Sequence, residues 1–127
     1  LCSILTDEGI DFIHLSCWNA FKGSISYRNN SKTLTEWFAT SLNNPPSIIS
    51  TGKVWSSKDA QHLLNQGADL IGVGRAAIGH PDWARQVKNI NYDPAKPPFS
   101  VNQLKEAMLS DVFIDYMRNW EGFICEK

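Results

Sequence analysis

The stretch that decides the fold is Gly67-Ala68-Asp69-Leu70-Ile71-Gly72-Val73-Gly74-Arg75. Its short apolar run opens after a glycine and closes at Gly74 and Arg75, and this pattern predicts a buried parallel strand. The strand would end at a glycine, which has no side chain, followed by the guanidinium of Arg75. A guanidinium can donate two parallel hydrogen bonds to phosphate oxygens, and a glycine lets a ligand approach the main chain closely. We therefore expect an anion to bind at this strand end.

A second segment has the same plan, an apolar run followed by a glycine and a cation: Ile48-Ile49-Ser50-Thr51-Gly52-Lys53. We expect the two strand ends to lie side by side, so that Gly52, Lys53, Gly74 and Arg75 surround one anion. Two simpler interpretations stay open from the residues alone. Arg75 could be the partner of an acidic side chain in an ion pair. Gly52 and Gly74 could be simple turn residues with no role in ligand binding.

Alternating strand and helix signals run through residues 1–88. A helix remnant ends at Gly9, and a strand is expected at residues 11–16, with His14 as an interior histidine. A long polar loop over residues 17–32 follows. The capping patterns Thr33-Leu34-Thr35-Glu36 and Ser56-Ser57-Lys58-Asp59 predict two helices, the second with a buried face of Ala60, Leu63 and Leu64. Another helix is expected from Pro81 and Asp82.

This order predicts an α/β fold with parallel strands and crossover helices. Three strands do not close a barrel, and a (β/α)₈ TIM barrel needs about 250 residues. We therefore expect residues 1–88 to be about the last three βα units of such a barrel, with the anion site in the loops after the last two strands. Residues 89–127 are expected to form a proline-bearing linker and a C-terminal helical extension. The expected apolar face of that extension consists of Val101, Leu104, Met108, Val112, Phe113, Tyr116 and Trp120.

Composition excludes several classes of function. The net charge of −1 gives no electrostatic case for nucleic acid or an acidic membrane surface. Cys2, Cys17 and Cys125 are odd in number and lack metal-ligand spacing, so we expect three free thiols, a reducing compartment and no metal. His62 and His80 are expected on the surface and in a turn.

Several of these segments resemble the C-terminal part of the Old Yellow Enzyme family, the NAD(P)H-dependent flavin oxidoreductases. The resemblance covers about residues 1–88. It rests on Ile10-Asp11-Phe12-Ile13-His14-Leu15-Ser16, on Gly52, on Gly67 through Ala76, and on His80-Pro81-Asp82-Trp83. At His80 the sequence departs from the family, where an acidic residue usually precedes the proline.

The resemblance implies an FMN-binding barrel in which Gly52, Gly74 and Arg75 hold the FMN phosphate, with Lys53 beside them. It also implies a hydride donor, NADH or NADPH, a small-molecule electron acceptor, a cytoplasmic location and a possible homo-oligomer. Family members carry their substrate-anchoring and proton-donating residues on earlier strands. No catalytic residue is therefore expected here, and the fragment alone is expected to be inactive.

Two other functions remain open at this point. A tRNA-dihydrouridine synthase barrel ends in a similar strand-Gly-Arg-Ala segment but has proline and tryptophan in direct succession, whereas Asp82 separates Pro81 from Trp83 here. The chain could also be a non-catalytic piece of a barrel that binds phosphate weakly or not at all.

Overall fold

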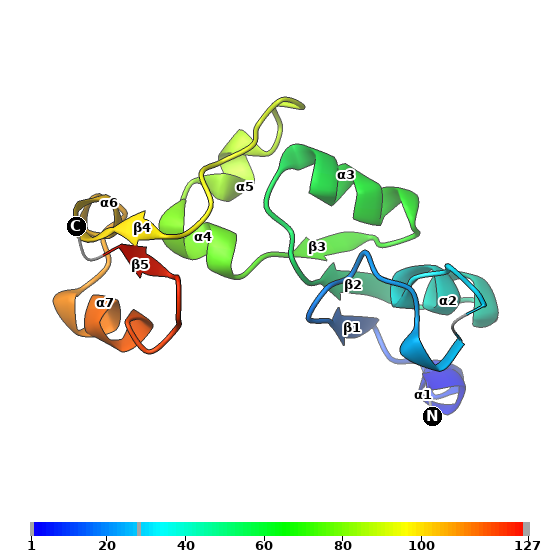
Figure 1. Ribbon diagram of the computed structural model, residues 1–127. Coiled ribbons are helices and arrows are strands. Elements are labelled where there is room, and N and C mark those ends of the chain that lie inside the picture. Colours follow the sequence, from blue (N-terminus) through cyan, green and yellow to red (C-terminus); the bar gives the residue numbers. More distant parts are fainter. Residues whose placement is uncertain (1, 28, 126–127) are drawn as a thin grey trace.

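A computed structural model describes residues 2–27 and 29–125 of the chain. Figure 1 shows a sheet with its helices at one end of the molecule and a small C-terminal unit at the other. The elements are α1 (Cys2–Asp7), β1 (Phe12–Ser16), the 3₁₀ turn η1 (Ile25–Tyr27), α2 (Leu34–Ser41), β2 (Ser47–Thr51), α3 (Ser57–Asn65), β3 (Leu70–Gly72), α4 (Arg75–Gly79), α5 (Trp83–Gln86), β4 (Phe99–Ser100), α6 (Val101–Glu106), α7 (Asp111–Met117) and β5 (Ile124–Cys125). Within the described residues, no helix has the length and apolar character needed to cross a membrane.

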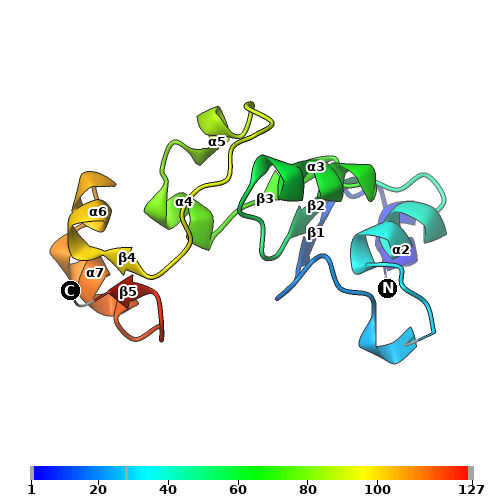
Figure 2. The same cartoon turned by 45° about the horizontal axis from the view of Figure 1, so that its top comes forward.

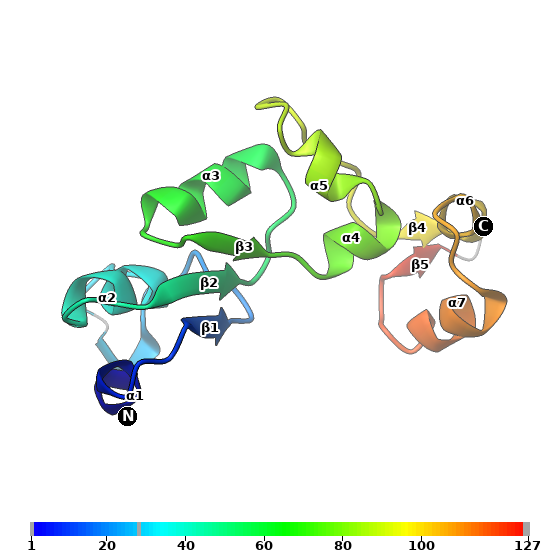
Figure 3. The ribbon, with the colours of Figure 1, turned by 180° about the vertical axis from the view of Figure 1, so that it is seen from behind.

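The main sheet has three parallel strands in the order β1-β2-β3. The expected α/β arrangement with adjacent parallel strands is thus confirmed. In the register of the sheet, Ser16 lies beside Thr51, and Thr51 lies beside Gly72. The carboxyl ends of all three strands therefore meet at one edge, which Figure 3 shows from behind.

Both predicted capping boxes are present. The Thr33 side chain accepts a hydrogen bond from the Glu36 backbone at the start of α2, and Ser56 does the same with Asp59 at the start of α3. The Glu36 and Asp59 carboxylates accept from the cap backbone in return, so two otherwise unpaired donors are satisfied at each helix start. One expectation for α3 is wrong: Leu64 is exposed, and the buried residues are Ser57, Ala60 and Leu63.

The two faces of the sheet differ in how they are covered. Alternate side chains, among them Ile13, Leu15 and Ile48, are buried against α1 and α2. Ser50 on the same face bonds Thr35 of α2 at 2.7 Å, and α3 packs along β3 (Figure 2). The opposite face, called the open face below, consists of Phe12, His14, Ser16, Ser47, Ile49, Thr51, Leu70 and Gly72.

The open face carries large apolar side chains where β1 and β3 begin, and polar side chains near the carboxyl ends of the strands. Phe12 and Leu70 are each 55% exposed there, because no described helix covers them. His14 also lies on this face and is exposed, so the expectation of an interior histidine is wrong for the described chain. A parallel sheet normally has both faces covered, and an exposed apolar face on one is therefore unusual.

The segment after β3 differs from the expected strand end. Gly74 is the N-cap of the short helix α4, and Arg75 is its first residue rather than the end of a strand. Pro81 precedes α5 instead of starting it, because the helix begins at Trp83 with Asp82 as its N-cap. His80 caps the C-terminal end of α4, and its ring bonds the Ala95 carbonyl at 2.9 Å.

The turn after α5 is attached to the start of α3 by backbone and side-chain bonds. The Ser57 hydroxyl lies within hydrogen-bond distance of the Val87 and Asn89 carbonyls, and the Ser57 N–H donates to the Tyr92 carbonyl at 2.9 Å. The Trp83 indole donates to the buried Trp55 carbonyl at 2.6 Å. These bonds attach the segment after β3 to the β2–α3 loop.

The C-terminal unit is helical, as expected, with the two helices α6 and α7, and it also has a pair of short parallel strands that the sequence pattern did not indicate. β4 and β5 pair through Phe99 beside Ile124. The expected apolar face is mostly wrong: Leu104 is buried, whereas Met108 is 89% exposed and Val112 is 80% exposed. The helix breaks at Met108, which has a positive φ of 64°, so the periodicity does not continue. Ile114, Met117 and Phe123 are buried instead.

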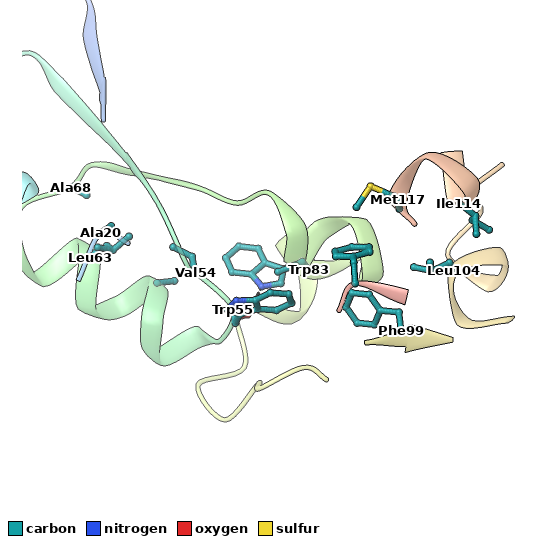
Figure 4. Close-up of a cluster of buried hydrophobic side chains, with 13 residues drawn as sticks. Ala20, Val54, Trp55, Leu63, Ala68, Trp83, Phe99, Leu104, Ile114 and Met117 are labelled. Carbon is teal, nitrogen blue, oxygen red and sulfur yellow. Dashed lines mark hydrogen bonds between the residues drawn. The ribbon is translucent and has the colours of Figure 1, made fainter. Parts of the chain in front are cut away.

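One buried cluster extends from the β2–α3 loop into the C-terminal unit, as Figure 4 shows. Trp55 and Trp83 lie near Phe99, which contacts Phe123 edge to face. The Phe99 ring rests on Gly79 so closely that a Cβ there would lie 2.5 Å from it. Phe99 and α6 thus pack against α4, and the division of the chain at residue 89 into a barrel part and a C-terminal extension stays a prediction.

The Trp83 indole bond provides a test of this packing. Replacing Trp83 with Phe keeps an aromatic ring but leaves the buried Trp55 carbonyl without its donor. An unsatisfied buried acceptor costs about 1 to 3 kcal/mol, and we expect the free energy of unfolding to fall by that amount in urea titrations. Trp120→Phe is the matched control, because Trp120 is 46% exposed. Equal losses for the two variants would contradict the importance of this bond.

Candidate anion-binding site

A cavity of about 190 Å³ lies at the carboxyl ends of the three strands. All four residues predicted to bind the anion line it: Gly52, Lys53, Gly74 and Arg75. The other lining residues are Cys17, Trp18, Thr51, Val54, Trp55, Gly72 and Ala76. The structure thus brings together the two glycine-cation pairs that lie far apart in the sequence.

The first pair forms a tight turn after β2. Gly52 has a φ of 147°, and a Cβ there would lie 2.4 Å from the Cys17 carbonyl oxygen and 2.9 Å from the Ala20 nitrogen. Glycine is therefore required here because the β1–α2 loop packs against it, which is a different reason from the close ligand approach expected from the sequence. Lys53 follows with a φ of 58° and an exposed side chain.

The second pair forms the turn after β3. A Cβ on Gly74 would meet no atom within 4 Å, so the main chain at this position faces open space. The Arg75 guanidinium lies 5.6 Å from the centre of the Trp18 ring, a cation–π contact. No ion pair of Arg75 occurs among residues 2–27 and 29–125. The simpler interpretation of Arg75 as an ion-pair partner therefore has no support in the described chain.

The backbone of both turns offers further donors. Within the described part of the chain, no group accepts a hydrogen bond from the N–H groups of Lys53, Gly74 or Arg75. Backbone N–H groups need a partner, and a concave set of them is a recurrent anion-binding arrangement. Together with two cations that lack acidic partners, they make the cavity suited to a negatively charged group.

Seven lining residues were not predicted from the sequence to bind the anion, and Trp18, Thr51 and Gly72 are the most relevant of them. Trp18 lies in the long loop over residues 17–32, and only its place in a strand-to-helix loop could have indicated it. Thr51 and Gly72 belong to the quoted strand segments, but their contact depends on the register of β2 with β3. Their roles follow from packing between strands, which a single-sequence pattern does not specify.

Cys17 also lines the cavity, with a half-buried thiol. Burial raises the pKa of the Cys17 thiol above its usual value, because the charged thiolate is poorly solvated there. The thiol is therefore less reactive than an ordinary surface cysteine. All three cysteines are free in the structure, in agreement with the expected absence of disulfides.

The three histidines lie apart from one another. The His14 Nε2 atom is 2.8 Å from the Thr51 hydroxyl, and the exposed His62 contacts Phe21 edge to face. His80 contacts Phe99. Within the described residues, no group of three or more His, Cys, Asp or Glu side chains could hold a metal ion.

Curated relatives match part of the chain. An NADH:fumarate oxidoreductase of Klebsiella pneumoniae (strain 342) is 33% identical over 87 residues, covering 65% of this chain and 9% of the relative. An NADH:acrylate oxidoreductase of Vibrio harveyi is 28% identical over 89 residues, covering 67% and 9%. A probable NADH-dependent flavin oxidoreductase of Bacillus subtilis (strain 168) is 24% identical over 88 residues, covering 69% and 24%.

No protein-family model matches the chain. The chain spans about a tenth of the length of the first two relatives and about a quarter of the third. Their names are those of NADH-dependent oxidoreductases, and the third is named as a probable flavin oxidoreductase. The resemblance to NADH-dependent flavin oxidoreductases that the sequence indicated is confirmed by these matches.

Gly52 and Gly74 differ in what a side chain would meet, and this difference can be measured. Gly52→Ala should lower the free energy of unfolding by more than about 1 kcal/mol, because the φ and the Cys17 carbonyl both oppose a Cβ. Gly74→Ala is the matched control, since its Cβ meets open space. Urea unfolding without ligand compares the two. Equal stabilities would show that the loop moves freely to accept the Gly52 side chain.

The raised pKa of Cys17 predicts the pH dependence of its alkylation. A thiol whose pKa is raised in the folded state carries less thiolate than in the unfolded chain until the pH exceeds the folded-state pKa. The midpoint of the rate-against-pH curve for Cys17 should therefore lie higher in the folded protein than in urea. A variant with Cys2→Ser and Cys125→Ser isolates the signal. A folded midpoint at or below the unfolded one would contradict the role of burial.

Proposed function

We propose that this chain supplies the FMN-phosphate-binding part of an NADH-dependent flavin oxidoreductase of the Old Yellow Enzyme family. The observation that carries the proposal is the meeting of two glycine-cation turns, Gly52-Lys53 and Gly74-Arg75, around one cavity. The confirmed resemblance to NADH-dependent relatives supports it from an independent direction.

The residues present fit a phosphate group rather than a whole cofactor. Sites for complete small ligands usually measure about 300 to 1,000 Å³, and this cavity of about 190 Å³ is smaller. Its donors are backbone N–H groups and two cations, which match the oxygens of a phosphate dianion. Lys53, Gly74 and Arg75 would hold the phosphate, and Gly52 would shape the turn that presents them.

The open face of the sheet supports the proposal that these strands come from a TIM barrel. Exposed Phe12 and Leu70 are ordinary interior residues once further strands close the sheet. In such barrels the phosphate site is commonly made by the loops after strands seven and eight. On this proposal β2 and β3 are those two strands, and β1 is the sixth.

The chemistry supplied by a bound FMN is hydride transfer from NADH or NADPH to a small-molecule electron acceptor. The residues of this chain bind and orient the phosphate end, where Arg75 adds a fixed charge and Trp18 lies against it. None of them is assigned a proton transfer or a substrate contact. The proposed location of the enzyme is the cytoplasm.

Substitutions at the two cations test the phosphate assignment in the complete protein. A hydrogen bond to a charged group contributes about 1.5 to 3 kcal/mol, so Arg75→Ala should weaken FMN binding by roughly tenfold or more. Lys53→Ala should have a smaller effect, because an exposed lysine acts as a flexible point charge. Gly74→Val should weaken binding more than either, since its side chain would enter the space at the cavity.

Dissociation constants for FMN and for riboflavin, measured by fluorescence, check these expectations. Riboflavin lacks the phosphate and should bind the variants and the unmodified protein alike. Arg85→Ala and Lys88→Ala are the matched controls, because both side chains are exposed and lie outside the cavity. The assignment fails if Arg75→Ala binds FMN as tightly as the unmodified protein, or if riboflavin loses affinity to the same degree.

A further inference from the structure

A hydrogen-bonded pair on the open face lies directly against the anion cavity. His14 of β1 and Thr51 of β2 are 2.8 Å apart, measured from the Nε2 atom to the side-chain oxygen. Thr51 lines the cavity, whereas His14 does not. The two strands are neighbours in the sheet (Figure 3), and the bond crosses from one to the other.

The position of the Thr51 hydroxyl is also determined from the other side, by Gly72. A Cβ added at Gly72 would lie 1.7 Å from the Thr51 side-chain oxygen, so the hydroxyl occupies the space that a side chain there would need. Gly72 lies beside Thr51 in the sheet register and lines the same cavity. The hydroxyl is therefore held between His14 and the main chain of β3 at the edge of the cavity.

The chemistry of the groups determines which way the protons point. A threonine hydroxyl has one proton to donate and two lone pairs to accept with. A phosphate oxygen with full negative charge only accepts, so Thr51 can bind it only by donating its single proton. His14 must then donate to Thr51, which requires a proton on Nε2.

We propose that Thr51 is a further ligand-binding residue of the cavity, donating to the phosphate, and that His14 is the positioning residue that orients its hydroxyl. The inference rests on the phosphate site proposed above and adds two residues from outside the glycine-cation turns. It also gives His14, which lies on the open face of the sheet, a defined hydrogen-bonding role.

The test uses the complete protein with FMN and riboflavin as probes. Thr51→Val keeps the shape and the β-branched strand residue but removes the hydroxyl, and FMN binding should weaken by roughly tenfold while riboflavin binding is unchanged. Thr51→Ser restores the hydroxyl and should recover most of the affinity. Thr51→Ala is measured alongside, so that the result does not depend on the folding of one variant.

The role of His14 is tested by non-additivity. His14→Phe should weaken FMN binding by roughly threefold, which is less than the loss for Thr51→Val, because the hydroxyl remains but is no longer oriented. The double variant should bind FMN as weakly as Thr51→Val alone, since His14 acts through Thr51. Nitrogen-15 NMR of the FMN-bound protein should show the proton of His14 on Nε2.

Matched controls are Thr40→Val and His62→Phe, whose exposed side chains lie outside the cavity. If Arg75→Ala loses FMN affinity but Thr51→Val does not, this inference is overturned and the proposed function stands. If neither variant loses affinity, both fail. Additive losses in the double variant, or equal losses for riboflavin, would overturn the inference in its stated form.

Discussion

The parallel pairing of β2 with β3 is the contact on which the candidate site depends. It places Thr51 beside Gly72, so the turns that follow the two strands open toward the same point. Each turn alone would carry one cation and some backbone N–H groups without an acceptor. Only the two turns together form a cavity with Lys53 and Arg75 on its wall. The charge at the site is therefore a consequence of strand register.

The register is supported by packing on the other face of the sheet. Ser50 bonds Thr35 of α2, and the Asp69 carboxylate accepts a hydrogen bond from the Ile48 backbone at 2.8 Å. Both contacts oppose a slip of one residue, which would turn Thr51 toward the helices. The helical side thus specifies the position of residues that act on the opposite face.

Aromatic residues of α5 and of the C-terminal unit support the wall of the cavity that Trp55 forms. Phe99 packs on Gly79 and contacts His80, while Trp83 bonds the Trp55 carbonyl. Trp55 lines the cavity directly, so the cluster that attaches residues 99–125 also supports one of its walls. A loss of packing in this unit should therefore be transmitted to the loop that carries Lys53.

The sequence by itself determined the parallel α/β order and both capping boxes, and it predicted that Gly52, Lys53, Gly74 and Arg75 lie around one space. These features depend on local signals, namely apolar runs, cap residues and glycine-cation pairs. The tertiary structure alone decided the cation–π contact of Arg75 with Trp18, the exposed His14 and its bond to Thr51, and the buried set Ile114, Met117 and Phe123. Each of these depends on strand register, on a break such as that at Met108, or on which face finds a partner. Such pairings join residues distant in the chain, and no local periodicity encodes them.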